Sequence, residues 1–213
     1  MTFVLALLIA LPNIDFIDDS DRSRTIDTWK GTPTILVPIY TRCPSACLLL
    51  TRSLKHAVLR SNANPASYRV VLFSFDPRDT PADLRAFRER ERVPLPWTIA
   101  TARPDKVRAL MDAIGFRYAD TNGQFLHPSF AVALTPDLQP AKTLAGTAFD
   151  GQDIDRALVI ARGGRDWLGD YGAYALAVLI LACTLSAVYI AVAFPARKST
   201  APLDCARDRP RAG

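Results

Sequence analysis

Cysteine and histidine are scarce in this chain of 213 residues, which contains four cysteines and two histidines. So few cysteines in a chain of this length exclude a small domain held together mainly by disulfide bonds. Cys43 and Cys47 lie close together, whereas Cys183 lies in an apolar run and Cys205 in a charged tail. The local pair therefore points to a metal or redox site.

The chain also lacks a basic stripe with interleaved aromatic residues, although its formal net charge is +5. Lys and Arg alternate with Asp and Glu along most of its length, which is typical of an ordinary solvated surface. The sequence thus gives no support to nucleic-acid binding. It shows no internal repeat and no low-complexity tract, and its length predicts one domain with additional segments.

Charge and proline are both missing from residues 173–194 (AYALAVLILACTLSAVYIAVAF). About 20 apolar residues can cross a bilayer as a helix, so we predict a transmembrane helix here. A buried core helix, the alternative, would need a shorter or amphipathic pattern. The tail at 195–213 is biased towards basic residues, and such flanks stay in the cytoplasm. We therefore expect a single-pass inner-membrane protein whose main domain faces the periplasm.

At the other end, residues 2–11 (TFVLALLIAL) form an apolar stretch too short to span a bilayer. It resembles the hydrophobic region of an export signal but lacks the basic residues that normally precede one. We interpret residues 1–24 as a signal segment and lead-in, with a buried strand as the alternative. Residues 25–166 are then the exported domain.

Within that domain, short apolar segments rich in β-branched and aromatic residues alternate with segments of helical periodicity. Pro38 in the first strand indicates an edge position or a bend, and Asp79 or Thr80 is the expected N-cap of the helix that starts at Pro81. This order predicts an α/β, thioredoxin-like fold with helices on both faces of a small sheet. The predicted strands are 34–40, 68–75, 97–100, 130–134 and 142–145, and the predicted helices cover 48–59, 81–88, 104–114 and 150–161.

The cysteine pair lies in residues 41–47 (TRCPSAC), between the first strand and the first helix. Two cysteines four apart at the start of a helix can bring both sulfurs to one side. The positive end of the helix dipole favours thiolate there, and thiolates bind metals and attack disulfides. The alternative is a structural disulfide, although so tight a loop would stabilise the fold little.

The available ligands favour copper over zinc. Soft thiolates select copper(I), zinc or iron–sulfur clusters, and structural zinc takes four protein ligands. The exported region offers only two cysteines and two histidines, and His56, nine residues past Cys47 on the polar side of its helix, is interpreted as a surface residue. His127 precedes the strand at 130–134, and in a thioredoxin-like sheet that loop lies beside the first helix, although a lone loop histidine is commonly a surface residue. A set of Cys43, Cys47 and His127 fits copper(I).

Three blocks of the sequence, TRCPSAC, FSFDPRDTP and LHPSFAVALTPD, resemble the signature blocks of the Sco/SenC family in the same order. The resemblance covers about residues 34–161. It implies that Cys43, Cys47 and His127 bind copper, as Cu(I) or Cu(II). It further implies a metallochaperone for the dinuclear copper centre of cytochrome c oxidase, whose partner is the copper-bearing oxidase subunit or another copper chaperone.

The same resemblance gives Asp76 or Asp79 a part in organising the site, while an Asp-Pro turn and an N-cap are equally good explanations of these residues. Three positions depart from the family pattern: Leu48 replaces a frequent proline, the DPRDTP block is one residue shorter, and Leu126 replaces an aspartate before the histidine. The last change removes a possible carboxylate partner and would retune copper binding. In addition, the predicted anchor lies at the C-terminus, whereas family members are usually anchored at the N-terminus.

Two other functions stay open. In a thiol-disulfide oxidoreductase, Cys43 would attack a partner disulfide and Cys47 would resolve the mixed disulfide. In a thioredoxin-like peroxidase, Thr41 and Arg42 would accompany a peroxidatic thiolate, although the close second cysteine and the DPRDTP block fit that pattern less well. His127 separates the first two functions, because copper binding should need it and simple thiol exchange should not. Enzymatic activity is thus left open.

Overall fold

The computed structural model describes residues 11–164, 177–186, 188 and 189. The chain divides into two units, Met1–Asp166 and Trp167–Gly213. In the second unit the described residues are helical and Cys183 is exposed.

Within the described residues, no helix is both long and apolar enough to span a membrane. Much of the predicted span at 173–194 lies outside those residues, as do the basic tail and Cys205. The same holds for nearly all of the predicted export signal, of which only Leu11 is described.

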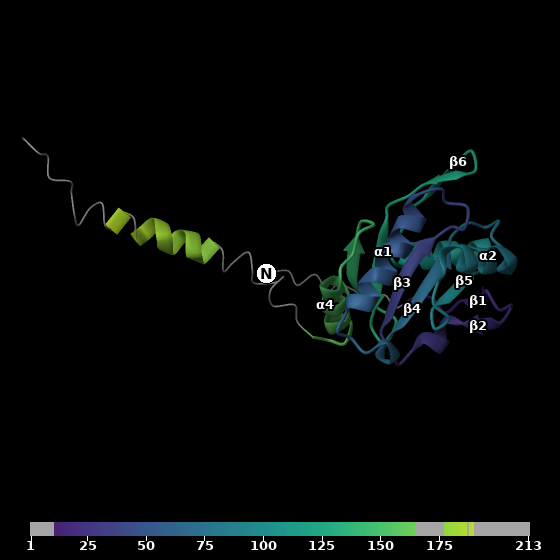
Figure 1. Ribbon diagram of the computed structural model, residues 1–213, viewed down its shortest axis with the longest axis horizontal. Coiled ribbons are helices and arrows are strands. Elements are labelled where there is room, and N and C mark those ends of the chain that lie inside the picture. Colours follow the sequence, from purple (N-terminus) through teal and green to yellow (C-terminus); the bar gives the residue numbers. More distant parts are fainter. Residues whose placement is uncertain (1–10, 165–176, 187, 190–213) are drawn as a thin grey trace, which may run out of the picture. The chain divides into compact units, whose positions relative to one another are not determined.

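A seven-stranded mixed sheet forms the centre of the first unit, with the order β2-β1-β5-β4-β3-β8-β9. Figure 1 labels β1 to β5 of this sheet. The three middle strands β5, β4 and β3 are parallel, and the others pair antiparallel. The strands are β1 (Asp15–Asp18), β2 (Ser23–Thr25), β3 (Thr34–Ile39), β4 (Arg69–Ser74), β5 (Thr98–Thr101), β8 (Phe130–Leu134) and β9 (Pro140–Ala145). A separate hairpin consists of β6 (Ala119–Thr121) and β7 (Gln124–Leu126).

The helices alternate with the strands, which confirms the predicted α/β order. They are α1 (Ala46–Arg60), α2 (Pro81–Glu91), α3 (Pro104–Ala113) and α4 (Gly151–Ala161), with the 3-10 helices η1 (Ile26–Trp29) and η2 (Pro65–Ser67). All six residues of β3 are buried. Because successive side chains of a strand point to opposite faces, both faces of the sheet are covered.

Two details of the sheet differ from the expectations drawn from the sequence. Pro38 does not mark an edge strand, because β3 lies between β4 and β8. The pairing of β3 with β8 covers only Thr34–Leu36, so Pro38 lies beyond it and its missing N–H leaves no β8 bond unmade. The sheet also begins before residue 25, because β1 and β2 lie in the segment interpreted as a lead-in.

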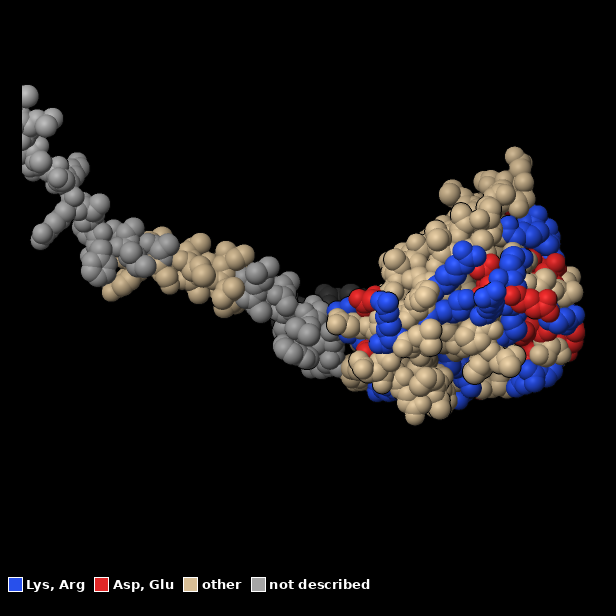
Figure 2. All heavy atoms as spheres, in the orientation of Figure 1, with Lys and Arg blue, Asp and Glu red and all other residues tan. Residues whose placement is uncertain are grey.

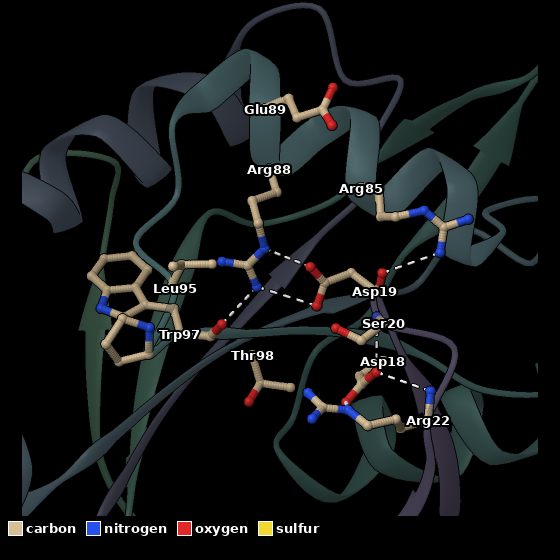
Figure 3. A pocket seen from close by; sticks show the side chains of 11 residues that line it. Asp18, Asp19, Ser20, Arg22, Arg85, Arg88, Glu89, Leu95, Trp97 and Thr98 are labelled. Atoms are coloured by element: carbon tan, nitrogen blue, oxygen red, sulfur yellow. Dashed lines mark hydrogen bonds and ion pairs between the residues drawn. The ribbon is translucent and has the colours of Figure 1, made fainter.

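An arginine of α2 fixes this N-terminal hairpin to the rest of the domain (Figure 3). The Arg88 guanidinium pairs with Asp19 after β1 and donates to the carbonyl of Trp97 directly before β5 (2.7 Å). A cavity of about 420 Å³ adjoins these groups. Arg22, which also lines it, pairs with Asp18. Because the charged groups beside this cavity pair with one another, we interpret the cavity as part of the structural framework of the domain.

The surface of the first unit carries both signs of charge. On the face drawn in Figure 2, Lys and Arg side chains lie among Asp and Glu side chains. This mixture agrees with the alternation of charge along the sequence.

The topology places three loops at one end of the sheet. The parallel strands β3 and β4 end side by side, so the loop at 41–45 and the loop at 76–80 lie together. Strand β8 runs antiparallel to β3, and its first residue therefore lies at the same end. His127 stands just before β8. This arrangement brings the cysteine loop and the histidine together across the chain.

Candidate metal centre

The cysteine loop joins β3 to α1. The N-cap of α1, Ser45, makes no side-chain capping hydrogen bond. Instead, the backbone N–H of Cys47 donates to the Sγ of Cys43 at 3.2 Å. Unpaired N–H groups and the positive end of the helix dipole both favour a negative charge at this point. A thiolate at Cys43 therefore serves as the acceptor for the start of the helix.

Three soft donor atoms meet at this loop. The Sγ atoms of Cys43 and Cys47 and one ring nitrogen of His127 all lie within 4.8 Å of one another. Both cysteines are buried free thiols, and Cys43, at 5% exposure, is slightly more accessible than Cys47 at 2%. His127 is half-buried, whereas His56 lies exposed on α1. The structure thus brings together the three residues singled out in the sequence and leaves His56 apart.

The imidazole of His127 is oriented by a backbone oxygen. Its Nδ1 lies 2.8 Å from the carbonyl oxygen of Pro128. Because a carbonyl can only accept, Nδ1 carries the hydrogen, and Nε2 is left to donate to the Cys43 thiolate when it is protonated or to bind a metal when it is not. This tautomer is the one that a neutral histidine ligand needs.

Aromatic rings surround the histidine, a feature that sequence reasoning missed. The His127 ring packs against Tyr40 at a centroid distance of 5.8 Å, against Phe75 at 5.2 Å and against Phe116 at 5.8 Å. Burial, followed by the negative charge at Cys43, raises the pKa of Tyr40 to about 12. Tyr40 is therefore a neutral hydrogen-bonding group at the edge of the site.

The two thiols have opposite proton affinities. A hydrogen bond from the Cys47 thiol lowers the pKa of Cys43 to about 3, against the opposing effect of burial, and a hydrogen bond with His127 adds to the lowering. The same shared hydrogen bond, burial and the charge at Cys43 all raise the pKa of Cys47. The hydrogen bond to Cys43 also raises the pKa of His127. One thiolate and one thiol are thus expected at neutral pH.

Asp79 holds the cysteine loop in place. Its carboxylate accepts hydrogen bonds from the backbone N–H of Thr41 (2.8 Å), the hydroxyl of Thr41 (2.6 Å) and the hydroxyl of Ser74 (2.5 Å). The N-cap of α2 is Thr80, in a capping box with Asp83. Asp79 therefore organises the residues next to Cys43 and is not the helix cap.

Asp76 is the second buried carboxylate, and it binds arginines. Its side chain is fully buried and pairs with Arg78 (Nε to Oδ1, 2.8 Å) and with Arg42 (3.3 Å). These hydrogen bonds and charges lower the pKa of Asp76, although burial acts in the opposite direction. Asp76 is thus an ionised anchor for the arginines around the site.

The residues expected for a peroxidase are occupied elsewhere. The hydroxyl of Thr41 donates to Asp79. The guanidinium of Arg42 pairs with Asp79 (3.1 Å) and Asp76. Neither group is committed to the sulfur of Cys43, so this arrangement does not favour a peroxide site.

The β6–β7 hairpin, which leads into His127, was also missed. Its two-residue turn is Asn122-Gly123, with φ values of 58° and 84°. Asn-Gly is a strong signal for a hairpin turn of this kind, because both positions need positive φ. The signal was present in the sequence, but the strands on either side have only three residues each.

Two sulfur atoms and one imidazole nitrogen are a donor set suited to a soft metal ion such as copper(I). Structural zinc takes four protein ligands, whereas a single cluster of three is found among the described residues. The same thiolate and thiol could also exchange with a disulfide. Both chemistries converge on Cys43.

Residues 11–159 match the family model described as SCO1/SenC. A search of curated proteins gave no match. Among solved structures, a candidate electron transfer protein from Aquifex aeolicus VF5 is 31% identical, with a TM-score of 0.71 over 76% of this chain and 97% of that one.

Two more distant structures share the fold. Arabidopsis thaliana ScoI with copper bound is 20% identical, with a TM-score of 0.62 over 72% of this chain and 98% of its own. BsSco, described as a member of the Sco family of cytochrome c oxidase assembly proteins with a disulfide switch, is 20% identical, with a TM-score of 0.63 over 73% and 94%. The domain is therefore thioredoxin-like, as predicted.

Proposed function

This chain belongs to the SCO1/SenC family, and we propose that it is a copper-binding metallochaperone for the dinuclear copper centre of cytochrome c oxidase. One observation carries the proposal: Cys43, Cys47 and His127 offer three soft donors within 4.8 Å of one another. Copper is the cargo of such a protein. The copper-bearing oxidase subunit, or another copper chaperone, is the partner that exchanges it.

The protonation of the centre fits uptake of copper(I). Cys43 supplies a thiolate, and Nε2 of His127 supplies a lone pair once any proton on it is lost. Cys47 must release its proton when the metal binds, because only the thiolate is a good ligand. Transfer to a partner would then proceed by exchange of these ligands for thiolates of the partner.

The test is copper(I) binding by the reduced full-length chain, measured by competition with a chromogenic copper(I) chelator. We expect one copper per chain, and a substantially weaker complex for His127→Ala. His56→Ala is the matched control, because His56 is exposed and does not belong to the cluster. Absence of tight binding, or equal binding by both variants, would refute the chaperone proposal.

A second function, thiol-disulfide exchange, is favoured by the thiolate at Cys43. Its sulfur would attack a partner disulfide and expel one partner thiolate. Cys47 would then attack the mixed disulfide, release the second thiolate and leave a Cys43–Cys47 disulfide. Because Cys47 gives the larger lowering of the Cys43 pKa, His127→Ala should leave most of this activity intact at neutral pH. Retained exchange with lost copper binding would separate the two functions.

We also propose that residues 173–194 anchor the protein in the inner membrane, with the domain in the periplasm and residues 195–213 in the cytoplasm. The support is the uncharged run and the basic tail that follows it. Labelling of Cys205 in spheroplasts with a membrane-impermeant maleimide, in a variant whose other three cysteines are replaced by serine, tests the orientation. We expect labelling of Cys205 only after the membrane is opened. Labelling from outside would show that the orientation is the opposite of the one proposed.

A further inference from the structure

The β6–β7 hairpin, which ends directly before His127, has little support of its own. It pairs with no other strand in the part of the chain that the structure describes. Five of its six strand residues are exposed, and Phe125 is half-buried. An isolated two-stranded hairpin is marginally stable in water. Contacts from outside the hairpin must therefore set its orientation.

Arg78 supplies two of these contacts. Its Nη2 donates to the carbonyl oxygen of Gly123 in the hairpin turn (3.0 Å). Its guanidinium carbon lies 5.4 Å from the ring centroid of Phe125. That ring packs in turn against Tyr40 at 5.1 Å and Phe75 at 5.3 Å. A single guanidinium thus contacts both the turn and the most buried strand side chain of the hairpin.

The same guanidinium is fixed from the side of the core. Arg78 Nε and Nη2 donate to the two carboxylate oxygens of Asp76, each at 2.8 Å. The backbone N–H of Arg78 also donates to Asp76 (2.9 Å). Asp76 is fully buried and follows the end of β4 by two residues. Two parallel bonds fix the plane of the guanidinium, which a single contact would not do.

We propose that Arg78 is a positioning residue of the metal centre, which joins buried Asp76 to the β6–β7 hairpin and thereby places the His127 ring against the two sulfurs. The inference rests on the proposed function, because it takes His127 as a copper ligand. Arg78 itself touches neither sulfur nor imidazole in any described contact. Lysine could keep the charge beside Asp76, but it cannot form the fork and reach Gly123 with the same group.

The test is a double-mutant cycle on copper(I) affinity in the full-length chain. Arg78→Met should weaken binding about tenfold, the lower end of the effect of groups that orient metal ligands. In a His127→Ala background the same substitution should have no further effect, because its action passes through His127. Arg103→Met is the control and should change nothing, since Arg103 is 81% exposed and pairs only with Asp105 in the described residues. Equal losses in both backgrounds, or no loss in either, would overturn the inference.

Arg78→Lys guards against a variant that fails to fold, because it keeps a cation beside buried Asp76. It should lose part of the affinity in the native background and none in the His127→Ala background. Full retention of affinity by both Arg78→Lys and Arg78→Met contradicts the positioning role.

A measurement without copper separates this inference from the proposed function. Amide hydrogen exchange of residues 123–126 should be faster in Arg78→Met than in the native chain, and unchanged in Arg103→Met. If His127→Ala alone leaves copper binding intact, the chaperone proposal fails, and the exchange result still decides whether Arg78 holds the hairpin. Unchanged exchange in Arg78→Met would overturn that role.

Discussion

Cys43 and Cys47 are attached to the core of the domain, whereas His127 is attached to a small hairpin at its surface. The cysteine loop follows the buried strand β3 and is bonded through Thr41 to the buried carboxylate of Asp79. The hairpin before His127 makes its own two-stranded sheet. The two cysteines are therefore held next to a buried strand, whereas the position of His127 depends also on the side-chain contacts of the hairpin. Changes on the cysteine side should affect stability, and changes on the histidine side mainly copper binding.

The largest effect on stability is expected for Asp79→Ala. Its removal leaves the N–H and hydroxyl of Thr41 and the hydroxyl of Ser74 without their acceptor, which should cost roughly 2–4 kcal/mol of the free energy of unfolding. The counterpart on the histidine side is Asp120→Ala, where an exposed carboxylate accepts, among the described residues, only from Gly123 N (2.7 Å). That change should cost less than about 1 kcal/mol. Urea denaturation of the reduced, copper-free protein measures the free energy of unfolding of both variants. Equal losses of stability would contradict the expected difference between the cysteine side and the histidine side.

Within the cysteine side, Cys47→Ala should raise the pKa of Cys43 strongly. The thiol of Cys47 is the largest cause of the lowering to about 3, and its loss should move the pKa towards the ordinary value of about 8.5. Alkylation of Cys43 by iodoacetamide at pH 5 should then slow at least tenfold, because less thiolate is present. His127→Ala should give a smaller change in the same direction. An alkylation rate at pH 5 that is unaffected by Cys47→Ala would show that the helix dipole and His127 are enough to keep Cys43 ionised.

Copper affinity should rise with pH. The raised pKa of Cys47 means that this thiol carries a proton in the metal-free protein at neutral pH, and copper must displace it. One released proton gives an increase of about tenfold in apparent affinity per pH unit between pH 6 and 8. The raised pKa of His127 adds a second proton at the acidic end and steepens the slope there. Chelator competition across this pH range measures the apparent copper(I) affinity. An affinity that does not change with pH would mean that Cys47 is already ionised in the metal-free protein.

A small effect on stability is expected for Gly123→Ala. Gly123 has a φ of 84°, and an added Cβ would lie 3.2 Å from Nη1 of Arg78. Gly31 has a similar φ of 81°, but its Cβ would meet nothing within 4 Å. Each alanine should cost about 1 kcal/mol of stability for its backbone conformation. Only Gly123→Ala should also weaken copper(I) binding. An equal change in copper(I) affinity for Gly123→Ala and Gly31→Ala would show that the hairpin turn does not influence the position of His127.

The cysteine side of the site can be predicted from the sequence more fully than the histidine side. The cysteine pair lies at a strand-to-helix boundary that local patterns reveal, with Cys43 in the loop before α1 and Cys47 in its first turn. The resemblance to Sco/SenC proteins that rests on TRCPSAC, FSFDPRDTP and LHPSFAVALTPD is confirmed at the level of the family. The β6–β7 hairpin escaped because its strands are short and exposed, so hydrophobic alternation is weak there, and only Asn122-Gly123 marked it.

Elements whose signals lie within a few residues of one another can be predicted from the amino-acid sequence. The strands at 34–39 and 130–134, the helix after Pro81 and the family motifs are of this kind, because periodicity, capping and spacing are local properties. Three features are visible in the tertiary structure alone: the central place of β3 despite Pro38, the bonds of Asp79 to Thr41, and the contact of Arg78 with the hairpin. These contacts join residues about 40 positions apart, and the pairing of β3 with β4 and β8 is what brings them together.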